Sequence, residues 1–140
     1  MSITELGRYE KAIERLEQAV AIHREVKDRA DEGAALNTLG IAYRHLGRYE
    51  KAVEYLEQAL AIHREMKNRI FEGNTLNNLS GAYYGLSRNE KAIEYFEQAL
   101  AISREVKDQT GESYILYSSA RAERSRRATS LRRAPASRRA

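Results

Sequence analysis

The residues of this sequence best able to do chemistry are its three histidines, and their spacing argues against a metal site. His23 and His63 lie 40 residues apart, and Ser103 follows at the same interval. Residues that recur at a fixed interval in a repetitive chain are displaced along the axis of the array and do not converge on one ion. His45 has no Cys and no suitably spaced partner, which a zinc site would require. We therefore expect no metal site, and we interpret His23 and His63 as solvated residues whose charge suits helix C-termini.

The carboxylates are numerous but do not suggest a catalytic pair. They recur along one face with lysines interleaved, which is typical of a solvated, salt-bridged helix surface. No glycine-rich phosphate loop and no defensible Ser–His–Asp combination is present. The sequence contains no Cys, so disulfides, thiolate metal sites and thiol nucleophiles are excluded. We expect the protein not to be an enzyme and to need no cofactor. The recurring carboxylates are Glu10, Glu14, Glu50, Glu54, Glu57, Glu90, Glu94 and Glu97.

An internal repeat of 40 residues must position all of these side chains. The block GRYEKAIERLEQAVAIHREVKDR at 7–29 matches 47–69 at 18 of 23 positions, and 87–109 matches that second copy at 15 of 23. The segments between the blocks are also in register. The chain is therefore predicted to be an array over 1–120, with complete units at 29–68 and 69–108 and partial units at both ends.

Helical periodicity in each half of the unit predicts pairs of helices. The expected helices span 8–28, 29–46, 49–68, 69–86 and 89–108, and a sixth begins near Asp108. Residues 1–6 align with the last turn of an earlier helix. Asp28, Asn68 and Asp108 are predicted N-caps, and Gly47 suits the left-handed position that ends a helix.

The order of residues within the unit resembles the tetratricopeptide repeat family. This resemblance implies an all-α, right-handed solenoid of antiparallel helix pairs with about six helices. The period of 40, longer than the usual 34 or so, is similar to that of bacterial regulator arrays, Pins-like scaffolds and kinesin light chains. HEAT repeats share the period but lack this residue order. The residues that carry the resemblance are Leu39, Gly40, Tyr43, Gly47, Tyr49, Ala52, Leu56 and Ala59, followed in the next unit by Leu79, Ser80, Tyr83, Ala92, Phe96 and Ala99.

The resemblance also implies that the first helices of successive units line a concave groove that binds a protein or peptide partner. Asn37 and Asn77 are expected to hydrogen-bond the backbone of an extended peptide, and Arg44 to pair with an acidic group. The alternative is that these asparagines hydrogen-bond between helices of the array. The predicted partner-binding residues are Asn37, Thr38, Ile41, Arg44, His45, Asn77, Asn78 and Tyr84.

Residues 121–140 differ in composition from the rest of the chain. Eight of the 24 basic residues and one of the 20 acidic residues lie there, so this segment carries +7 and residues 1–120 carry −3. We expect it to be disordered at least past Ala128. Its arginines suggest contact with nucleic acid or another polyanion, and an unselected terminus is the competing interpretation. The candidate polyanion contacts are Arg126, Arg127, Arg132, Arg133, Arg138 and Arg139.

The two partial units predict exposed ends. A solenoid repeat buries its apolar face only against its neighbours, and residues 8–28 are expected to present Ile13, Leu16 and Ala19 toward an absent helix. Self-association through these faces, or a place within a longer array, would cover them. No segment reaches the roughly 18 consecutive apolar residues of a membrane helix, so we expect a cytoplasmic location and no membrane span.

Overall fold

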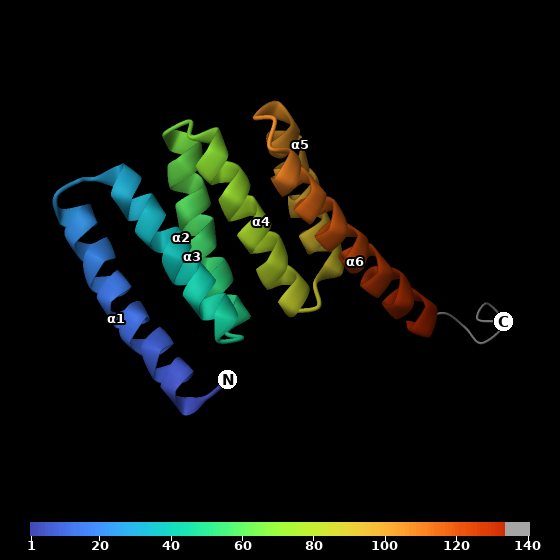
Figure 1. Ribbon diagram of the computed structural model, residues 1–140, viewed down its shortest axis with the longest axis horizontal. Coiled ribbons are helices and arrows are strands. Elements are labelled where there is room, and N and C mark those ends of the chain that lie inside the picture. Colours follow the sequence, from blue (N-terminus) through green and yellow to red (C-terminus); the bar gives the residue numbers. More distant parts are fainter. Residues whose placement is uncertain (134–140) are drawn as a thin grey trace.

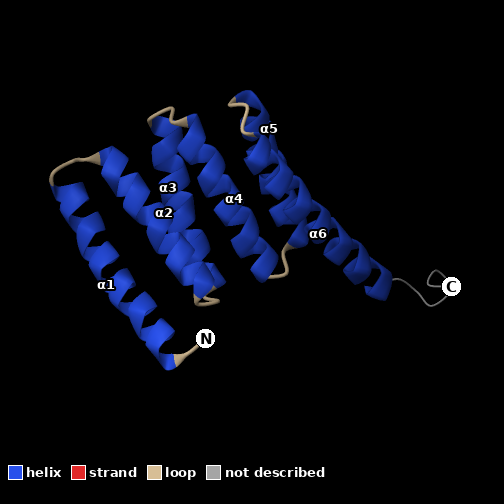
Figure 2. Ribbon diagram, in the orientation of Figure 1, coloured by secondary structure: helices blue, strands red, loops and turns tan. Residues whose placement is uncertain are grey.

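Six antiparallel α-helices make up the computed structural model, which describes residues 1–133. No strand occurs in this part of the chain (Figure 2). Successive helices stack side by side from the N-terminal to the C-terminal end (Figure 1), and this confirms the predicted all-α solenoid of helix pairs. Within residues 1–133 no helix is both long enough and apolar enough to cross a membrane. The helices are α1 (Ile3–Glu25), α2 (Arg29–His45), α3 (Tyr49–Glu65), α4 (Arg69–Gly85), α5 (Asn89–Glu105) and α6 (Gln109–Arg133).

Every connection between helices is short and contains one residue in the left-handed backbone region. Gly47 takes φ 73°, as predicted. Its counterparts in the other connections are not glycines: three lysines and a serine adopt φ between 55° and 60°, where a side chain is strained. The next residue donates its N–H back into the preceding helix, as Asp28 does to the His23 carbonyl at 2.8 Å. The strained residues are Lys27, Lys67, Ser87 and Lys107.

The predicted N-caps are confirmed. The carboxylate or amide oxygens of Asp28, Asn68 and Asp108 each accept a hydrogen bond from the backbone N–H three residues later, at distances of 2.9–3.2 Å. These caps begin α2, α4 and α6. By contrast, α3 and α5 begin without a side-chain cap. Each pair therefore consists of a capped first helix (α2, α4) and an uncapped second helix (α3, α5).

The two helices of a pair cross closely because one of them carries a small residue. Gly40 of α2 faces Leu56 of α3, and a Cβ on Gly40 would lie 2.3 Å from the Leu56 Cγ. Beside this crossing Tyr43 stacks on Tyr55 with ring centroids 5.5 Å apart, and the same stack recurs 40 residues later in the next pair. The repeated sequence therefore produces repeated packing.

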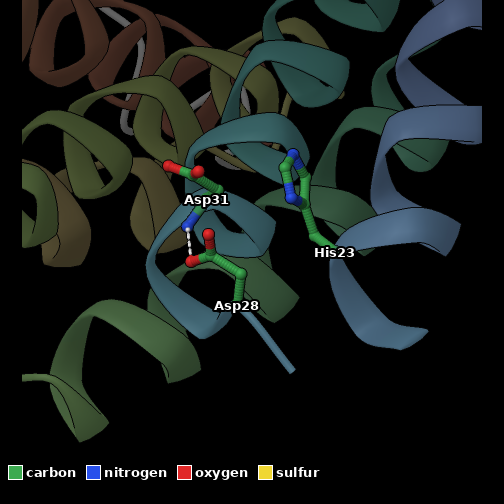
Figure 3. A group of neighbouring side chains, drawn as sticks. All are labelled: His23, Asp28 and Asp31. Atoms are coloured by element: carbon green, nitrogen blue, oxygen red, sulfur yellow. Dashed lines mark hydrogen bonds between the residues drawn. The ribbon is translucent and has the colours of Figure 1, made fainter. Parts of the chain in front are cut away.

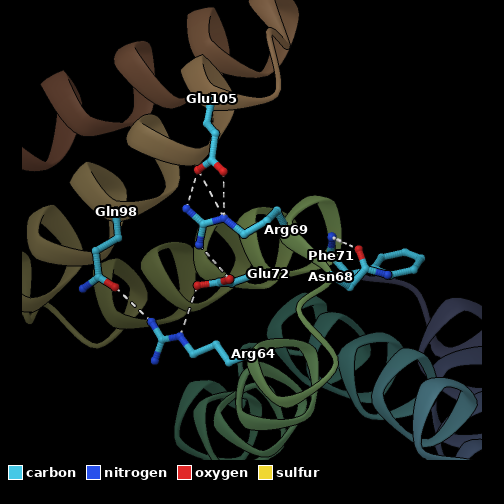
Figure 4. A network of polar contacts seen from close by, with 7 residues as sticks. All are labelled: Arg64, Asn68, Arg69, Phe71, Glu72, Gln98 and Glu105. Carbon is cyan, nitrogen blue, oxygen red and sulfur yellow. Dashed lines mark hydrogen bonds and ion pairs between the residues drawn. The ribbon is translucent and has the colours of Figure 1, made fainter.

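Buried glutamates join neighbouring pairs. Glu72 of α4 accepts hydrogen bonds from Arg64 at 3.2 Å and Arg69 at 3.0 Å (Figure 4). The same arginines continue to α5, where Arg64 donates to Gln98 at 3.0 Å and Arg69 pairs with Glu105. One buried carboxylate thus lies at the centre of a network that connects α3, α4 and α5.

The same network surrounds Glu32 in the preceding unit. Arg24 and Arg29 donate to its two oxygens at 2.9 Å and 3.1 Å. Burial raises the pKa of Glu32, but the hydrogen bonds from the two arginines outweigh burial and leave the pKa below its usual range. The carboxylate therefore stays charged at neutral pH.

The structure corrects the predicted N-terminal end. Residues 1–6 do not form a separate helix, because α1 runs unbroken from Ile3 through Gly7. Ser2 and Glu5 form a capping box: the Ser2 hydroxyl accepts from the Glu5 N–H, and the Ser2 N–H donates to the Glu5 carboxylate. This box starts the helix four residues before the position of Gly7, where the repeat pattern alone would place a turn.

The C-terminal segment also differs from its prediction. Helix α6 continues to Arg133, so residues 129–133 are helical and not disordered as expected past Ala128. Ala, Leu and Arg all favour helix, and no proline occurs before Pro135. The low apolar content of residues 121–140 predicted too little burial for an ordered segment. Ile115 and Ala122 are nevertheless buried, and they anchor the first half of α6 in the core.

Candidate functional site

A hollow of about 340 Å³, lined mainly by α4 and α6 with one residue each from α2, α3 and α5, is the best candidate for a binding site. We call it the groove. Its lining includes two arginines, three tyrosines and an asparagine, and none of the lining residues is acidic. An uncompensated pair of cations in a hollow with aromatic walls suits a partner that carries carboxylates. The lining residues are Arg44, Tyr49, Asn77, Gly81, Tyr84, Gly85, Phe96, Tyr114, Ser118 and Arg121.

Arg44 reaches the groove from α2 across the backbone of α4. A Cβ on Gly81 would lie 2.2 Å from the Arg44 Nη1, so the guanidinium occupies space that only glycine leaves open. Arg44 makes no ion pair within residues 1–133. Its donors are therefore not engaged by a carboxylate there and are available to a ligand.

Tyr84 and Arg121 form the opposite wall. The Arg121 guanidinium carbon lies 5.1 Å from the centroid of the Tyr84 ring, and the Tyr84 hydroxyl lies 3.1 Å from the Ser125 hydroxyl. The hydrogen bond with Ser125 lowers the pKa of Tyr84, burial opposes this effect, and Arg121 adds to the lowering. These contacts tie α4 to α6 and fix the orientation of both side chains.

The predicted asparagines do not behave alike. The Asn37 Oδ1 accepts hydrogen bonds from the Thr75 hydroxyl at 3.1 Å and from the Asn78 amide at 3.2 Å. Asn37 and Asn78 are therefore engaged with each other between α2 and α4, as the alternative interpretation of Asn37 describes. Asn77 lines the groove and makes no side-chain hydrogen bond within residues 1–133. Of the two asparagines predicted to bind a peptide backbone, only Asn77 has its whole carboxamide available.

The other predicted residues lie at the margin of the groove or away from it. Thr38 is exposed and donates its hydroxyl to the Ala34 carbonyl at 3.0 Å. His45 stacks on Tyr9 of α1, with centroids 5.6 Å apart. Ile41 is half-buried and does not line the hollow. The structure thus brings Arg44, Asn77 and Tyr84 together out of the eight residues predicted.

Several groove residues were missed by sequence reasoning. Tyr114, Ser118 and Arg121 come from α6, which departs from the repeat pattern, and Arg121 falls in the segment assigned to the tail. The available signal was the register: Arg121 stands 40 residues after Gly81 and 80 after Ile41. Extending the predicted face of the first helices by one more unit would have included it.

The arginines of the C-terminal segment lie along the far half of α6. Arg126 pairs with Glu123 at 2.7 Å, and Arg127 and Arg132 are exposed. Arg126 and Arg133 also line an open hollow of about 860 Å³ beside the start of α5, together with Arg88 and Lys91 and two glutamates. The remaining predicted contacts, Arg138 and Arg139, lie outside the described residues.

One set of possible metal ligands is present within residues 1–133. Ligand atoms of His23, Asp28 and Asp31 lie within 4.8 Å of one another at the turn between α1 and α2 (Figure 3). One Asp28 oxygen is already used, since it accepts the Asp31 N–H that caps α2. The corresponding positions of the next turn are His63, Asn68 and Phe71, so the set is not repeated. The 40-residue spacing of the histidines, on which the prediction of no metal site rests, does not bear on Asp28 and Asp31, which lie close to His23 in the sequence.

The prediction that His63 is solvated is wrong. His63 is 3% exposed, its ring stacks on Phe71 with centroids 5.4 Å apart, and its Nε2 has no hydrogen-bond partner within residues 1–133. Burial lowers the pKa of His63, and Glu72 opposes this effect only in part. The imidazole is therefore a core group that favours its neutral form.

Comparison with known proteins identifies the repeat. Sequence profiles described as tetratricopeptide repeat match residues 1–65 and 73–106. No curated protein matches the sequence. A signal transduction ATPase with a tetratricopeptide repeat sensor, from Pyrococcus horikoshii, is 25% identical with a TM-score of 0.75, over 81% of this chain and 18% of that chain.

Two further solved structures are similar. A putative kinesin light chain from Podosopora anserina with nearly identical repeats is 27% identical with a TM-score of 0.69, over 86% of this chain and 60% of that one. BtubC from P. vanneervenii is 22% identical with a TM-score of 0.63, over 89% and 59%, and it supports the fold alone. The chain therefore spans less than two thirds of each of these proteins.

Proposed function

Because the chain belongs to the tetratricopeptide repeat family, we propose that it is a protein–protein interaction module that binds an extended acidic segment of a partner in the groove. The family indicates interaction with proteins in general. The acidic partner is inferred from the groove itself, where Arg44 and Arg121 lie in one hollow without a carboxylate in its lining. That charge pattern is the observation that carries the proposal.

Each wall of the groove has a separate role in this proposal. Arg44 and Arg121 bind carboxylates, with several N–H donors in a rigid plane. Asn77 offers both an amide donor and a carbonyl acceptor, which match the backbone of an extended chain. Tyr84 and Tyr114 provide apolar surface for the intervening side chains. Recognition is therefore charged at two points, polar at one and apolar between them.

The groove is short, since only α2, α4 and α6 supply first helices. Binding must offset the lost freedom of the peptide, and a short contact leaves a small surplus. We expect weak binding, with a dissociation constant in the micromolar to millimolar range that these few contacts would support. A partner that touches a second surface as well would bind more tightly.

A peptide titration tests this proposal. The probe is a six-residue peptide of alternating glutamate and leucine, and the control probe carries lysine in place of glutamate. We expect the acidic peptide to bind and the basic peptide not to bind. Arg44→Ala and Arg121→Ala should each weaken binding roughly tenfold, as expected when a charge-assisted hydrogen bond is lost. Arg127→Ala, an exposed arginine outside the groove, is the matched control.

Folding and binding are measured together on each variant. Asn77→Ala should weaken binding with little change in stability, because the Asn77 side chain makes no hydrogen bond within residues 1–133. Asn37→Ala should lower stability, because Thr75 and Asn78 lose their acceptor. Equal affinity for the acidic and basic peptides, or unchanged binding by folded Arg44→Ala and Arg121→Ala variants, would overturn the proposal.

A second candidate function is the binding of a polyanion by the arginines of α6. It rests on the open hollow beside α5, where Arg88, Lys91, Arg126 and Arg133 outnumber the carboxylates Glu90 and Glu94. Electrostatic binding of nucleic acid falls steeply as salt rises. A salt series with a single-stranded oligonucleotide tests it, and affinity that is flat with salt or survives deletion of 121–140 would rule it out.

A further inference from the structure

We propose that copies of this chain associate head to tail, so that α6 of one copy packs against α1 of the next and the two complete a helix pair. The arrangement follows from the register of the repeat. Helix α6 corresponds to the first helices α2 and α4. It packs on α5, the second helix of the preceding pair, but no second helix of its own follows it within residues 1–133. Helix α1 corresponds to the second helices α3 and α5, and no first helix precedes it within the same residues. One copy thus presents both halves of a pair, at opposite ends (Figure 1).

The open face of α1 is a stripe whose counterparts elsewhere are buried. Ile22 is 58% exposed, whereas Ile62, 40 residues later, is 3% exposed. Ala12 is exposed and Leu16 is half-buried, although the equivalent Ala and Leu of α3 are fully buried against α2. The structure also corrects the predicted stripe, because Ile13 is buried and does not belong to it. The stripe consists of Ala12, Leu16, Ala19 and Ile22.

The open face of α6 also carries residues whose counterparts elsewhere are buried. Leu116 is 45% exposed, whereas Leu36 and Leu76 at the same register are fully buried. Ala120 takes the place of Gly40 and Ser80, the small residues that face the second helix of each pair. A small residue at 120 would therefore face Leu16 of the next copy, as Gly40 faces Leu56 within the chain. On α6 the centre of the proposed contact is apolar at Leu116 and Ala120, while Ser119 takes the place of the fully buried Leu39 and Leu79.

Charge complementarity identifies a second copy as the occupant. Within the chain, each crossing carries a tyrosine stack, Tyr43 with Tyr55 and its equivalent 40 residues later. At the two open ends these positions are Glu123 on α6 and Arg15 on α1. The proposed contact therefore replaces a tyrosine pair with a carboxylate and a guanidinium of opposite charge. Glu123 already pairs with Arg126 of the same helix at 2.7 Å, and Arg15 of the next copy would be a second cation at that carboxylate.

Hydrogen bonds from an arginine of one second helix to a glutamine of the next second helix recur along the chain, and we call this series the polar ladder. It supports the same alignment of α6 with α1 of the next copy. Arg24 donates to Gln58 at 2.8 Å, and Arg64 donates to Gln98 at 3.0 Å. Arg104 is next in the ladder and has only Glu112 as a partner within residues 1–133. The equivalent glutamine is Gln18, which is exposed on α1. Gln18 of the next copy would lie where the ladder continues.

The proposed contact joins the open face of α6 on one copy to the open face of α1 on another. A pair of copies therefore still has one uncovered α6 face and one uncovered α1 face. Such association produces chains or rings of copies and not a closed symmetric dimer. It uses the ends of the array and leaves the groove accessible. The proposal is therefore independent of the proposed peptide binding, and its failure would not affect that proposal.

Sedimentation velocity of the 140-residue chain over a range of concentrations tests the proposal. We expect the average mass to rise above that of a monomer as concentration increases. Ala12→Glu should remove the rise, because Ala12 lies at the centre of the contact but is exposed within one copy. Ala21→Glu is the matched control, since Ala21 and both of its register equivalents are exposed. Circular dichroism confirms that both variants are folded.

A charge exchange tests the register. Arg15→Glu and Glu123→Arg should each weaken association at least tenfold, because like charges then meet. An equimolar mixture of the two variants should associate again, since every contact in an alternating chain then pairs opposite charges. A chain that stays monomeric at all concentrations would overturn the proposal. Loss of association in the single variants without recovery in the mixture would overturn the register.

Discussion

The close crossing of α2 and α3 predicts an unusual response to alanine at Gly40. In a helix interior, replacing glycine with alanine normally stabilises by about 1 kcal/mol. Here a Cβ would lie 2.3 Å from the Leu56 Cγ and 2.5 Å from its Cδ2, and Leu56 is fully buried. Overpacking of this kind costs about 1–3 kcal/mol. Because both contacts are far inside van der Waals range, the upper part of that range applies, and we expect a net loss of about 1–2 kcal/mol.

Gly7→Ala is the matched control for this prediction. Gly7 also lies inside a helix, but nothing lies within 4 Å of its added Cβ, so alanine there should stabilise by about 0.5–1 kcal/mol. Urea unfolding followed by circular dichroism measures both changes. Opposite signs for the two variants are expected, and a stabilised Gly40→Ala would refute the packing argument.

The chain itself suggests a rescue. The next unit has Ser80 and Phe96 at the corresponding positions, and Ser80 is fully buried with its hydroxyl bonded to the Leu76 carbonyl at 2.8 Å. Gly40→Ser combined with Leu56→Phe transfers that crossing to the first unit. The double variant should lose less free energy of unfolding than the two single variants lose together. The difference measures the coupling between the two helices.

Three further predictions concern the turns and the buried polar groups. Lys67 takes φ 55°, so Lys67→Gly should raise the free energy of unfolding by about 1 kcal/mol, measured by urea titration. The folded-state pKa of His63 lies below the ordinary 6.5, so the unfolded chain binds more protons between these two values. Stability should therefore fall as pH drops below about 6.5, and His63→Ser, which copies Ser103, should flatten this dependence in thermal melts at pH 5–8. An unchanged slope would contradict the burial argument. Glu72→Ala should cost about 1–2 kcal/mol, because Arg64 and Arg69 lose their shared acceptor; hydrogen exchange that stays slow throughout α4 in this variant would show that the network does not hold α4 in place.

The fold could be predicted from the sequence because the repeat supplies independent copies of each signal. The N-caps at Asp28, Asn68 and Asp108 recur at one register, and the structure confirms all three. The beginning of α1 could not be obtained this way. There the local capping box of Ser2 and Glu5 overrides the turn that the repeat would place at Gly7. At this position the hydrogen bonds of the capping box, and not the repeat pattern, determine where the helix begins.

The candidate site was predicted only in part, for a physical reason. Helical periodicity places Asn37 and Asn77 on one face, but it does not show which side chains of adjacent helices meet. Asn37 proved to be bonded to α4, whereas Asn77 faces the groove. His63 was missed in the same way, because its burial depends on Phe71 from the following helix. Which side chains meet between two helices depends on how the helices pack. The residue pattern of a single helix does not determine that packing.

The most direct test of the proposed function is a titration of the ¹⁵N-labelled chain with the acidic glutamate–leucine peptide, followed by NMR. We expect saturable shifts at the groove residues of α2, α4 and α6 and at Tyr49 and Phe96, which also line the groove, with the Asn77 side-chain amide and the Gly81 amide among the largest. We expect no shifts with the lysine peptide. Shifts spread over α3 and α5 with α2 and α4 unaffected, or identical responses to both peptides, would contradict binding of an acidic segment in the groove.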